Sequence, residues 1–344
     1  MPCSSIKLYL IVKIKFWAIY KFLENEVTIM LSSRVLNNVT VKSTLQQRNP
    51  TMETNFRAIA TCLLAYFCFD LMSVHVRILS DTYSPQELSV YRNVIGVVPA
   101  IFYIWYSREL SLNFSSYKIE RWKLAVARGF VVAVAQLCFY TALSKLELAT
   151  VSALGQVSAL FIVLLAILIY KEKVGFWRWF AVIIGFLGAV MIIRPGSDIF
   201  SWYSLLPVGA AFCYATSIIT LRSFKSSVSS AILFLYSATS AAFGAIVLAL
   251  ASIEFTPIQS WIDGIFIISM SICGGFGVVF LMYAFRNAPS ALLAPFSYFG
   301  ILTSFLIGWL VFNEFPIDTI FPGVIFIVLS GLVIIWRENR KTAD

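Results

Sequence analysis

The chain has 344 residues, of which 60% are hydrophobic, 16% aromatic and only 12% charged, and its formal net charge is +9 at pH 7. The mean hydropathy of +0.85 excludes a soluble domain and favours a protein whose solvent is lipid. The basic residues lie between apolar segments and form no stripe on one surface, so the charge indicates membrane topology. No nucleic-acid partner is expected.

Residues 1–51 differ in character from the rest of the chain. The stretch "IKLYLIVKIKFWAIYKFL" is apolar, but four lysines interrupt it, and it lacks the small-residue cleavage pattern of a signal peptide. We interpret 1–51 as a disordered extension or as sequence upstream of the functional start, for which Met52 is a candidate. The alternative is a basic helix that lies on the inner leaflet.

Apolar stretches of about 20 residues, the length that spans a hydrocarbon core of roughly 30 Å, recur along the rest of the chain. They predict an all-α membrane protein with ten transmembrane helices, and the short connections make neighbouring helices antiparallel. The predicted spans are 58–79, 87–106, 122–143, 150–170, 175–193, 203–221, 230–252, 262–285, 290–312 and 317–336.

Basic residues are concentrated on alternate connections. One side carries Arg108, Lys118, Arg121, Lys123, Lys171, Lys173, Arg178, Arg222, Lys225, Arg286 and the tail residues Arg337, Arg340 and Lys341. The other side carries only Arg77, Lys145 and Arg194. Because positively charged loops stay in the cytoplasm, both termini, including the tail 338–344, are predicted to be cytoplasmic.

The chain contains an internal repeat. "FCFDLMSVHVR" (67–77) matches "FCYATSIITLR" (212–222), and a tyrosine-to-glutamate segment ending at Glu172 matches a second one ending at Glu314. The repeats are therefore about 57–194 and 202–337, with five spans each. Five is odd, so the second copy enters the membrane inverted, and two inverted copies favour a carrier that alternates between inward-open and outward-open states.

Two further motifs are "KEKVGFWRWFAVIIGFLGAVMIIRPG" and "APFSYFGILTSFLIGWLVFNEFP". Together with the repeat, they make residues 57–337 resemble the EamA family of the drug/metabolite transporter superfamily. The resemblance implies a bacterial inner-membrane protein with two inverted five-helix repeats around a central cavity. The first, third, fourth, sixth, eighth and ninth spans are then expected to line that cavity, which takes a small-molecule substrate such as an amino acid, nucleobase, vitamin, S-adenosylmethionine or drug.

Three ionisable residues lie at membrane depth, where an unpaired charge is costly: Asp70, Arg92 and Arg128. Asp70 shares a helix face with Tyr66 and Ser73. The depth of Arg92 permits an ion pair with Asp70, whereas Arg128 lies nearer the cytoplasmic end. Asp70 is a candidate for binding a cationic substrate group, for taking up a coupling proton or for holding Arg92 ready for substrate. The alternative is a structural ion pair between the first two helices.

Other polar residues on the expected cavity helices are candidates for substrate contact, with interhelical hydrogen bonding as the alternative for each. They are Gln136, Tyr140, Gln156, Tyr214 and Tyr298.

Small residues and a proline within the spans are assigned to helix packing or hinges. They are Gly185, Gly188, Gly274, Gly275 and Pro295.

Some charged residues recur between the two copies of the repeat. Arg77 matches Arg222, and Glu172 matches Glu314, so we interpret these four as duplicated scaffold and interfacial contacts.

The sequence offers no catalytic constellation, no phosphate-binding loop and no metal-ligand spacing, so neither enzymatic activity nor a cofactor or metal is predicted. The leading hypothesis is a secondary carrier for a small organic metabolite. Riboflavin uptake fits the tyrosines and glutamines best, and S-adenosylmethionine uptake or exchange comes next. Amino-acid or drug export remains an alternative, as does a non-transporting membrane sensor or assembly subunit. A homodimer is left open.

Overall fold

The structure, a computed structural model, describes residues 50–107, 119–171, 176–195, 200–224, 228–250, 255–288 and 293–341. The described residues are mostly helical and contain no strand, which confirms the predicted all-α membrane fold. Seven helical segments are long and apolar enough to cross a membrane, and the fifth, ninth and tenth predicted spans correspond to shorter apolar helices. The predicted N-terminal extension lies outside the described residues as far as position 49.

The elements follow the predicted spans closely. In chain order they are α2 (Pro50–Leu79), α3 (Pro85–Ile95), α4 (Val97–Tyr106), α5 (Trp122–Leu143), α6 (Leu148–Gly155), α7 (Ser158–Tyr170), α8 (Phe176–Ile193), η2 (Trp202–Ser204), α9 (Leu205–Ile219), η3 (Thr220–Ser223), α10 (Ser230–Leu250), α11 (Trp261–Asn287), η4 (Ala294–Tyr298), α13 (Phe299–Phe312), α14 (Ile317–Ile320) and α15 (Gly323–Lys341).

The predicted start of the tenth span, at residue 317, is wrong. The chain forms the single turn α14 and then passes through Phe321 and Pro322 before α15 begins at Gly323. Proline lacks the backbone N–H that a helix needs, and it disfavours helical geometry in the residue before it. The last long helix therefore begins only after the proline.

Matching irregularities occur in the fourth and ninth spans. The fourth is interrupted after α6, at Gln156, and the ninth changes from η4 to α13 after Tyr298. These two residues lie equally far before Glu172 and Glu314 in the sequence. Both helices end at a left-handed residue, with φ of 52° at Lys171 and 55° at Asn313. A duplicated unit accounts for such agreement, although the repeat boundaries themselves stay a prediction.

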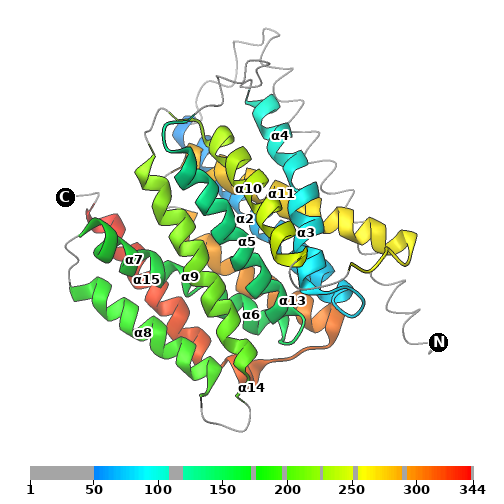
Figure 1. The fold of residues 1–344 in the computed structure, drawn as a ribbon. Helices are drawn as coiled ribbons and strands as arrows, with labels where there is room; N and C mark the ends of the chain where they lie inside the picture. Colours follow the sequence, from blue (N-terminus) through cyan, green and yellow to red (C-terminus); the bar gives the residue numbers. More distant parts are fainter. Residues whose placement is uncertain are drawn as a thin grey trace, which may run out of the picture.

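Helices of the two sequence halves pack against each other throughout the bundle. Helix α2 contacts α11, α5 contacts both α9 and α10, and α8 lies beside α15 along one flank (Figure 1). The α8–α15 contact is close because glycines face it. A Cβ at Gly188 would lie 2.6 Å from the Gly323 carbonyl oxygen, and one at Gly185 would lie 2.6 Å from Ser330 Oγ.

Large apolar side chains cover the outside of the bundle. Leu168, Phe176, Trp261 and Leu302 are each exposed. An apolar surface of this kind is an aggregation hazard in water, whereas in a bilayer it contacts lipid. The polar residues that remain inside the bundle are therefore the ones to consider for function.

Candidate functional site

Asp70 lies in the interior of the bundle, on the face of α2 that meets α13. Its side chain is 6% exposed, and its Oδ2 accepts a hydrogen bond from the Thr303 hydroxyl. A Cβ at Gly300 would lie 4.0 Å from Asp70 Oδ2 and 3.8 Å from the ring of Tyr66. Tyr66 and Asp70 therefore share the face that packs against α13, as their spacing on the helix predicts.

The predicted ion pair between Asp70 and Arg92 is wrong. Arg92, on α3, donates from Nη1 to Asn93 Oδ1 at 3.1 Å and from Nη2 to the Gly274 carbonyl oxygen at 3.4 Å. Its guanidinium thus lies beside α11, whereas the Asp70 carboxyl is directed to α13. The two charges point toward different helices, which a helix-face argument from one span does not reveal.

Arg92 belongs to a polar network that connects α3 with α5. Asn93 is buried, and its Nδ2 donates to Gln136 Oε1 at 2.6 Å and to the Ser89 carbonyl oxygen at 2.8 Å. Sequence reasoning found Arg92 and Gln136 but missed Asn93, which connects them. The available signal was an amide side chain next to an arginine within an apolar span.

Two tyrosines lie near the Arg92 guanidinium. Tyr140 on α5 is 1% exposed and donates to Met72 Sδ at 3.5 Å. The hydroxyls of Tyr140 and of Tyr214 on α9 are both within electrostatic reach of Arg92. Residues from α2, α3, α5 and α9 thus meet around one cationic group.

A glycine of α11 makes room for this cluster. A Cβ at Gly274 would lie 2.6 Å from Met72 Sδ and 3.0 Å from Arg92 Nε. At the next position, a Cβ at Gly275 would lie 2.5 Å from Pro99. The missing side chain at Gly274 therefore leaves space for the Arg92 side chain as well as for close packing of the helices.

Three of the predicted residues make their hydrogen bonds or contacts with groups other than Asp70 and Arg92. Ser73 donates to the carbonyl oxygen of Phe69 within its own helix. Gln156 donates to the Ser297 carbonyl oxygen at 3.1 Å and joins the fourth span to the ninth. The Tyr298 hydroxyl lies against Gly331, so closely that a Cβ there would overlap it. Pro295, from the same group of predictions, lies in η4.

Arg128 joins three helices away from the Asp70 carboxyl. Its Nε donates to the Ser217 carbonyl oxygen at 2.8 Å and its Nη1 to Ser237 Oγ at 3.2 Å. The guanidinium carbon lies 6.0 Å from the centre of the Phe224 ring. These contacts connect α5 with α9 and α10, so the donors of Arg128 are engaged in helix packing.

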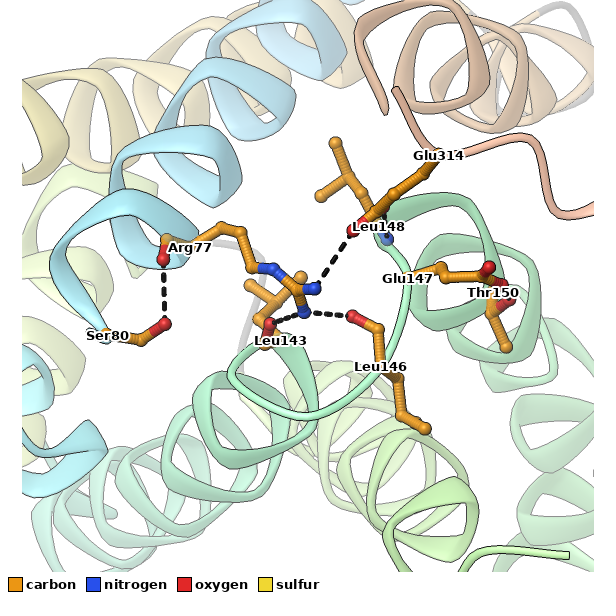
Figure 2. A network of polar contacts seen from close by, with 8 residues as sticks. All are labelled: Arg77, Ser80, Leu143, Leu146, Glu147, Leu148, Thr150 and Glu314. Atoms are coloured by element: carbon orange, nitrogen blue, oxygen red, sulfur yellow. Dashed lines mark hydrogen bonds and ion pairs between the residues drawn. The ribbon is translucent and has the colours of Figure 1, made fainter. Parts of the chain in front are cut away.

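A second polar network closes one end of the bundle (Figure 2). Arg77 Nη2 forms an ion pair with Glu314 Oε1 at 2.9 Å, and Arg77 Nη1 donates to the carbonyl oxygens of Leu143 and Leu146. Glu314 Oε2 also accepts from the Leu148 backbone N–H at 3.0 Å. The network joins the end of α2, the α5–α6 connection and the segment after α13. Glu172, the sequence counterpart of Glu314, lies outside the described residues.

Comparison with known proteins gives a family and a group of relatives. Residues 56–194 match the EamA-like transporter family. An S-adenosylmethionine uptake transporter of Rickettsia prowazekii is 24% identical over 297 residues, which cover 86% of this chain and 98% of that relative. A riboflavin transporter of Vibrio cholerae is 31% identical over 191 residues, which cover 55% of this chain and 63% of that relative.

The fold also resembles a solved structure. That protein chain matches with a TM-score of 0.58 at 17% sequence identity, and the match covers 82% of this chain and 98% of the other. At this identity the likeness concerns the fold alone.

Proposed function

Because the chain belongs to the EamA-like transporter family, we propose that it is a secondary carrier that moves a small organic metabolite, with Asp70 and Arg92 in its substrate or coupling site. One observation carries the assignment of the site. Asp70 is buried and Arg92 is partly buried, and neither forms an ion pair with another described residue. Charges at membrane depth are costly and are retained where they meet a ligand, a coupling ion or water.

The two residues have complementary roles in this proposal. Asp70, whose Oδ2 accepts a hydrogen bond from Thr303, receives a positive charge, either from a cationic group of the substrate or from a coupling proton. Arg92, surrounded by Tyr140 and Tyr214, meets the negative or hydrogen-bond-accepting part of the substrate. Exchange between the two predicted inverted repeats opens this region to either side in turn.

The separation of the charges favours a substrate that carries charges of both signs. S-adenosylmethionine has a carboxylate and two cationic groups, and the Rickettsia relative named for its uptake matches nearly over its full length. We therefore place S-adenosylmethionine uptake before riboflavin uptake. Riboflavin is the second candidate, supported by the tyrosines near Arg92 and by the Vibrio relative. The proposed location is the bacterial inner membrane with both termini in the cytoplasm.

An uptake assay tests the proposal. Purified protein in proteoliposomes is given labelled S-adenosylmethionine, riboflavin or amino acids, with a pH gradient and in exchange mode. We expect wild-type uptake of one of these solutes and its loss in Asp70→Asn and in Arg92→Gln. Asp81→Asn and Arg121→Gln are matched controls on the exposed surface. If the wild-type protein takes up none of these solutes, the result argues for a non-transporting membrane subunit. If both site variants take up solute at the wild-type rate, the substrate or coupling site lies elsewhere.

A further inference from the structure

One nitrogen of the Arg92 guanidinium lacks a hydrogen-bond acceptor. Nη1 donates to Asn93 Oδ1 at 3.1 Å, and Nη2 makes a long contact of 3.4 Å with the Gly274 carbonyl oxygen. The Tyr140 hydroxyl also lies within hydrogen-bonding reach of the Arg92 side chain. Nε is shielded from solvent and is the sole buried side-chain nitrogen or oxygen among the described residues that lacks a hydrogen-bond partner. A buried donor without an acceptor is unfavourable, so an acceptor at Nε stabilises the site.

The edge that carries the unpartnered Nε has a definite chemical preference. Nε and Nη2 present two parallel N–H groups, which is the arrangement that binds both oxygens of a carboxylate. We propose that the Nε–Nη2 edge of Arg92 binds a carboxylate of the transported solute. This inference rests on the proposed carrier function and narrows its substrate class. It favours S-adenosylmethionine, which has a carboxylate, over riboflavin, which has none.

The protein does not supply this carboxylate from the part of the chain that the structure describes. Asp70 accepts from Thr303, Glu314 pairs with Arg77, and Glu87 accepts the backbone and hydroxyl of Ser84 at the start of α3. The near groups are neutral instead. The hydroxyls of Tyr140 and Tyr214 lie within electrostatic reach of Arg92, and that of Tyr140 is placed to accept a hydrogen bond from it, but neither supplies a negative charge.

Gln136 is a positioning residue for this site. The Asn93 side chain turns its oxygen toward Arg92 because its nitrogen is held by Gln136 Oε1 at 2.6 Å and by the Ser89 carbonyl oxygen at 2.8 Å. Nη1 is thereby engaged, and Nε is left without an acceptor. Gln136 acts on the ligand through Asn93 and Arg92, so its loss is expected to reduce selectivity for a carboxylate.

The matched probes are S-adenosylmethionine and decarboxylated S-adenosylmethionine, which differ only in the carboxylate. Binding to the full-length protein in detergent is measured by calorimetry, and the arginine Nε–H signals are followed by NMR after ¹⁵N labelling. The Arg92 signal is identified by its absence from Arg92→Lys, which keeps the charge and loses the planar edge. The Arg121 signal is the control, because that side chain lies at the exposed surface.

We expect S-adenosylmethionine to bind about tenfold to a hundredfold more tightly than the decarboxylated probe. Only S-adenosylmethionine should shift the Arg92 signal, and Arg92→Lys and Gln136→Met should both reduce the preference. Equal affinity for the two probes, or an unshifted Arg92 signal with S-adenosylmethionine and with a mixture of amino acids, overturns the inference. Riboflavin transport that persists in Arg92→Lys also overturns it but leaves the carrier function intact. If the protein takes up none of the solutes, the carrier function is contradicted. The carboxylate site is still tested in that case, because the NMR signal of Arg92 reports binding directly.

Discussion

Arg77 and Glu314 lie 237 positions apart in the sequence and form an ion pair of 2.9 Å at the end of the bundle. Both side chains are partly shielded, with exposed fractions of 24% and 13%. Glu314 also accepts the backbone N–H of Leu148. In this structure the contact therefore fastens the two sequence halves together at this end, and any movement that separates α2 from the end of α13 has to break it.

The strength of this contact is measurable by a double-mutant cycle with Arg77→Gln and Glu314→Gln. Each single variant is expected to lower the free energy of unfolding, and the two effects should overlap by about 1 to 2 kcal/mol, because both remove one charge-assisted hydrogen bond. Equilibrium unfolding in SDS provides the measurement. Strictly additive effects would show that the ion pair contributes nothing.

The carboxyl of Glu147 lies beside this ion pair, outside the membrane spans. Burial raises its pKa above the ordinary value of 4.5 and the charge of Glu314 raises it further, whereas the Thr150 hydroxyl and Arg77 lower it. A carboxyl with a raised pKa binds its proton more tightly in the folded state than in the unfolded state. The folded state consequently loses stability as the pH rises above the ordinary carboxyl pKa.

Glu147→Gln removes this titration while it keeps an acceptor for Thr150. We expect the variant to be more stable than wild type at neutral pH and the difference to vanish below the ordinary carboxyl pKa. Unfolding of both proteins across that pH range checks the sign. A difference that is independent of pH would contradict the raised pKa.

Thr303 supplies a hydrogen bond to Asp70. Thr303→Val keeps the shape and removes the donor. A typical hydrogen bond contributes about 0.5 to 1.5 kcal/mol, so transport is expected to fall about twofold to tenfold. Thr303→Ser keeps the hydroxyl and should retain transport. Initial uptake rates in proteoliposomes compare the two, and equal rates for Val and Ser would remove Thr303 from the site.

Two glycines offer a matched test of helix packing. A Cβ at Gly188 would meet the Gly323 carbonyl oxygen at 2.6 Å, whereas a Cβ at Gly209 would meet nothing within 4 Å. Gly188→Ala should cost about 1 to 3 kcal/mol through overpacking, and Gly209→Ala should leave stability unchanged or slightly higher. The same unfolding assay separates them. Equal stabilities would mean that α8 and α15 can move apart at little cost.

The spans were predictable from sequence because every backbone polar group in a membrane must be bonded within its own helix, which leaves long apolar segments as the signal. The start of α15 was missed because the apolar pattern continues through Pro322.

The site was predictable only in part. Helical spacing gives the face that Asp70 shares with Tyr66, but not the neighbouring helix, so the pairing with Arg92 was wrong and Thr303 was missed. Asn93 was missed for a related reason, since a single amide in an apolar span gives little signal until its partners are known.

Counterflow tests the central claim most directly. Proteoliposomes preloaded with unlabelled S-adenosylmethionine are diluted into labelled S-adenosylmethionine, with riboflavin tested in parallel, for wild type, Asp70→Asn and the surface control Asp81→Asn. A carrier with Asp70 in its site predicts a transient accumulation of label above equilibrium in wild type and in Asp81→Asn, and none in Asp70→Asn. The absence of accumulation in wild type with both solutes, or an unchanged accumulation in Asp70→Asn, would contradict it.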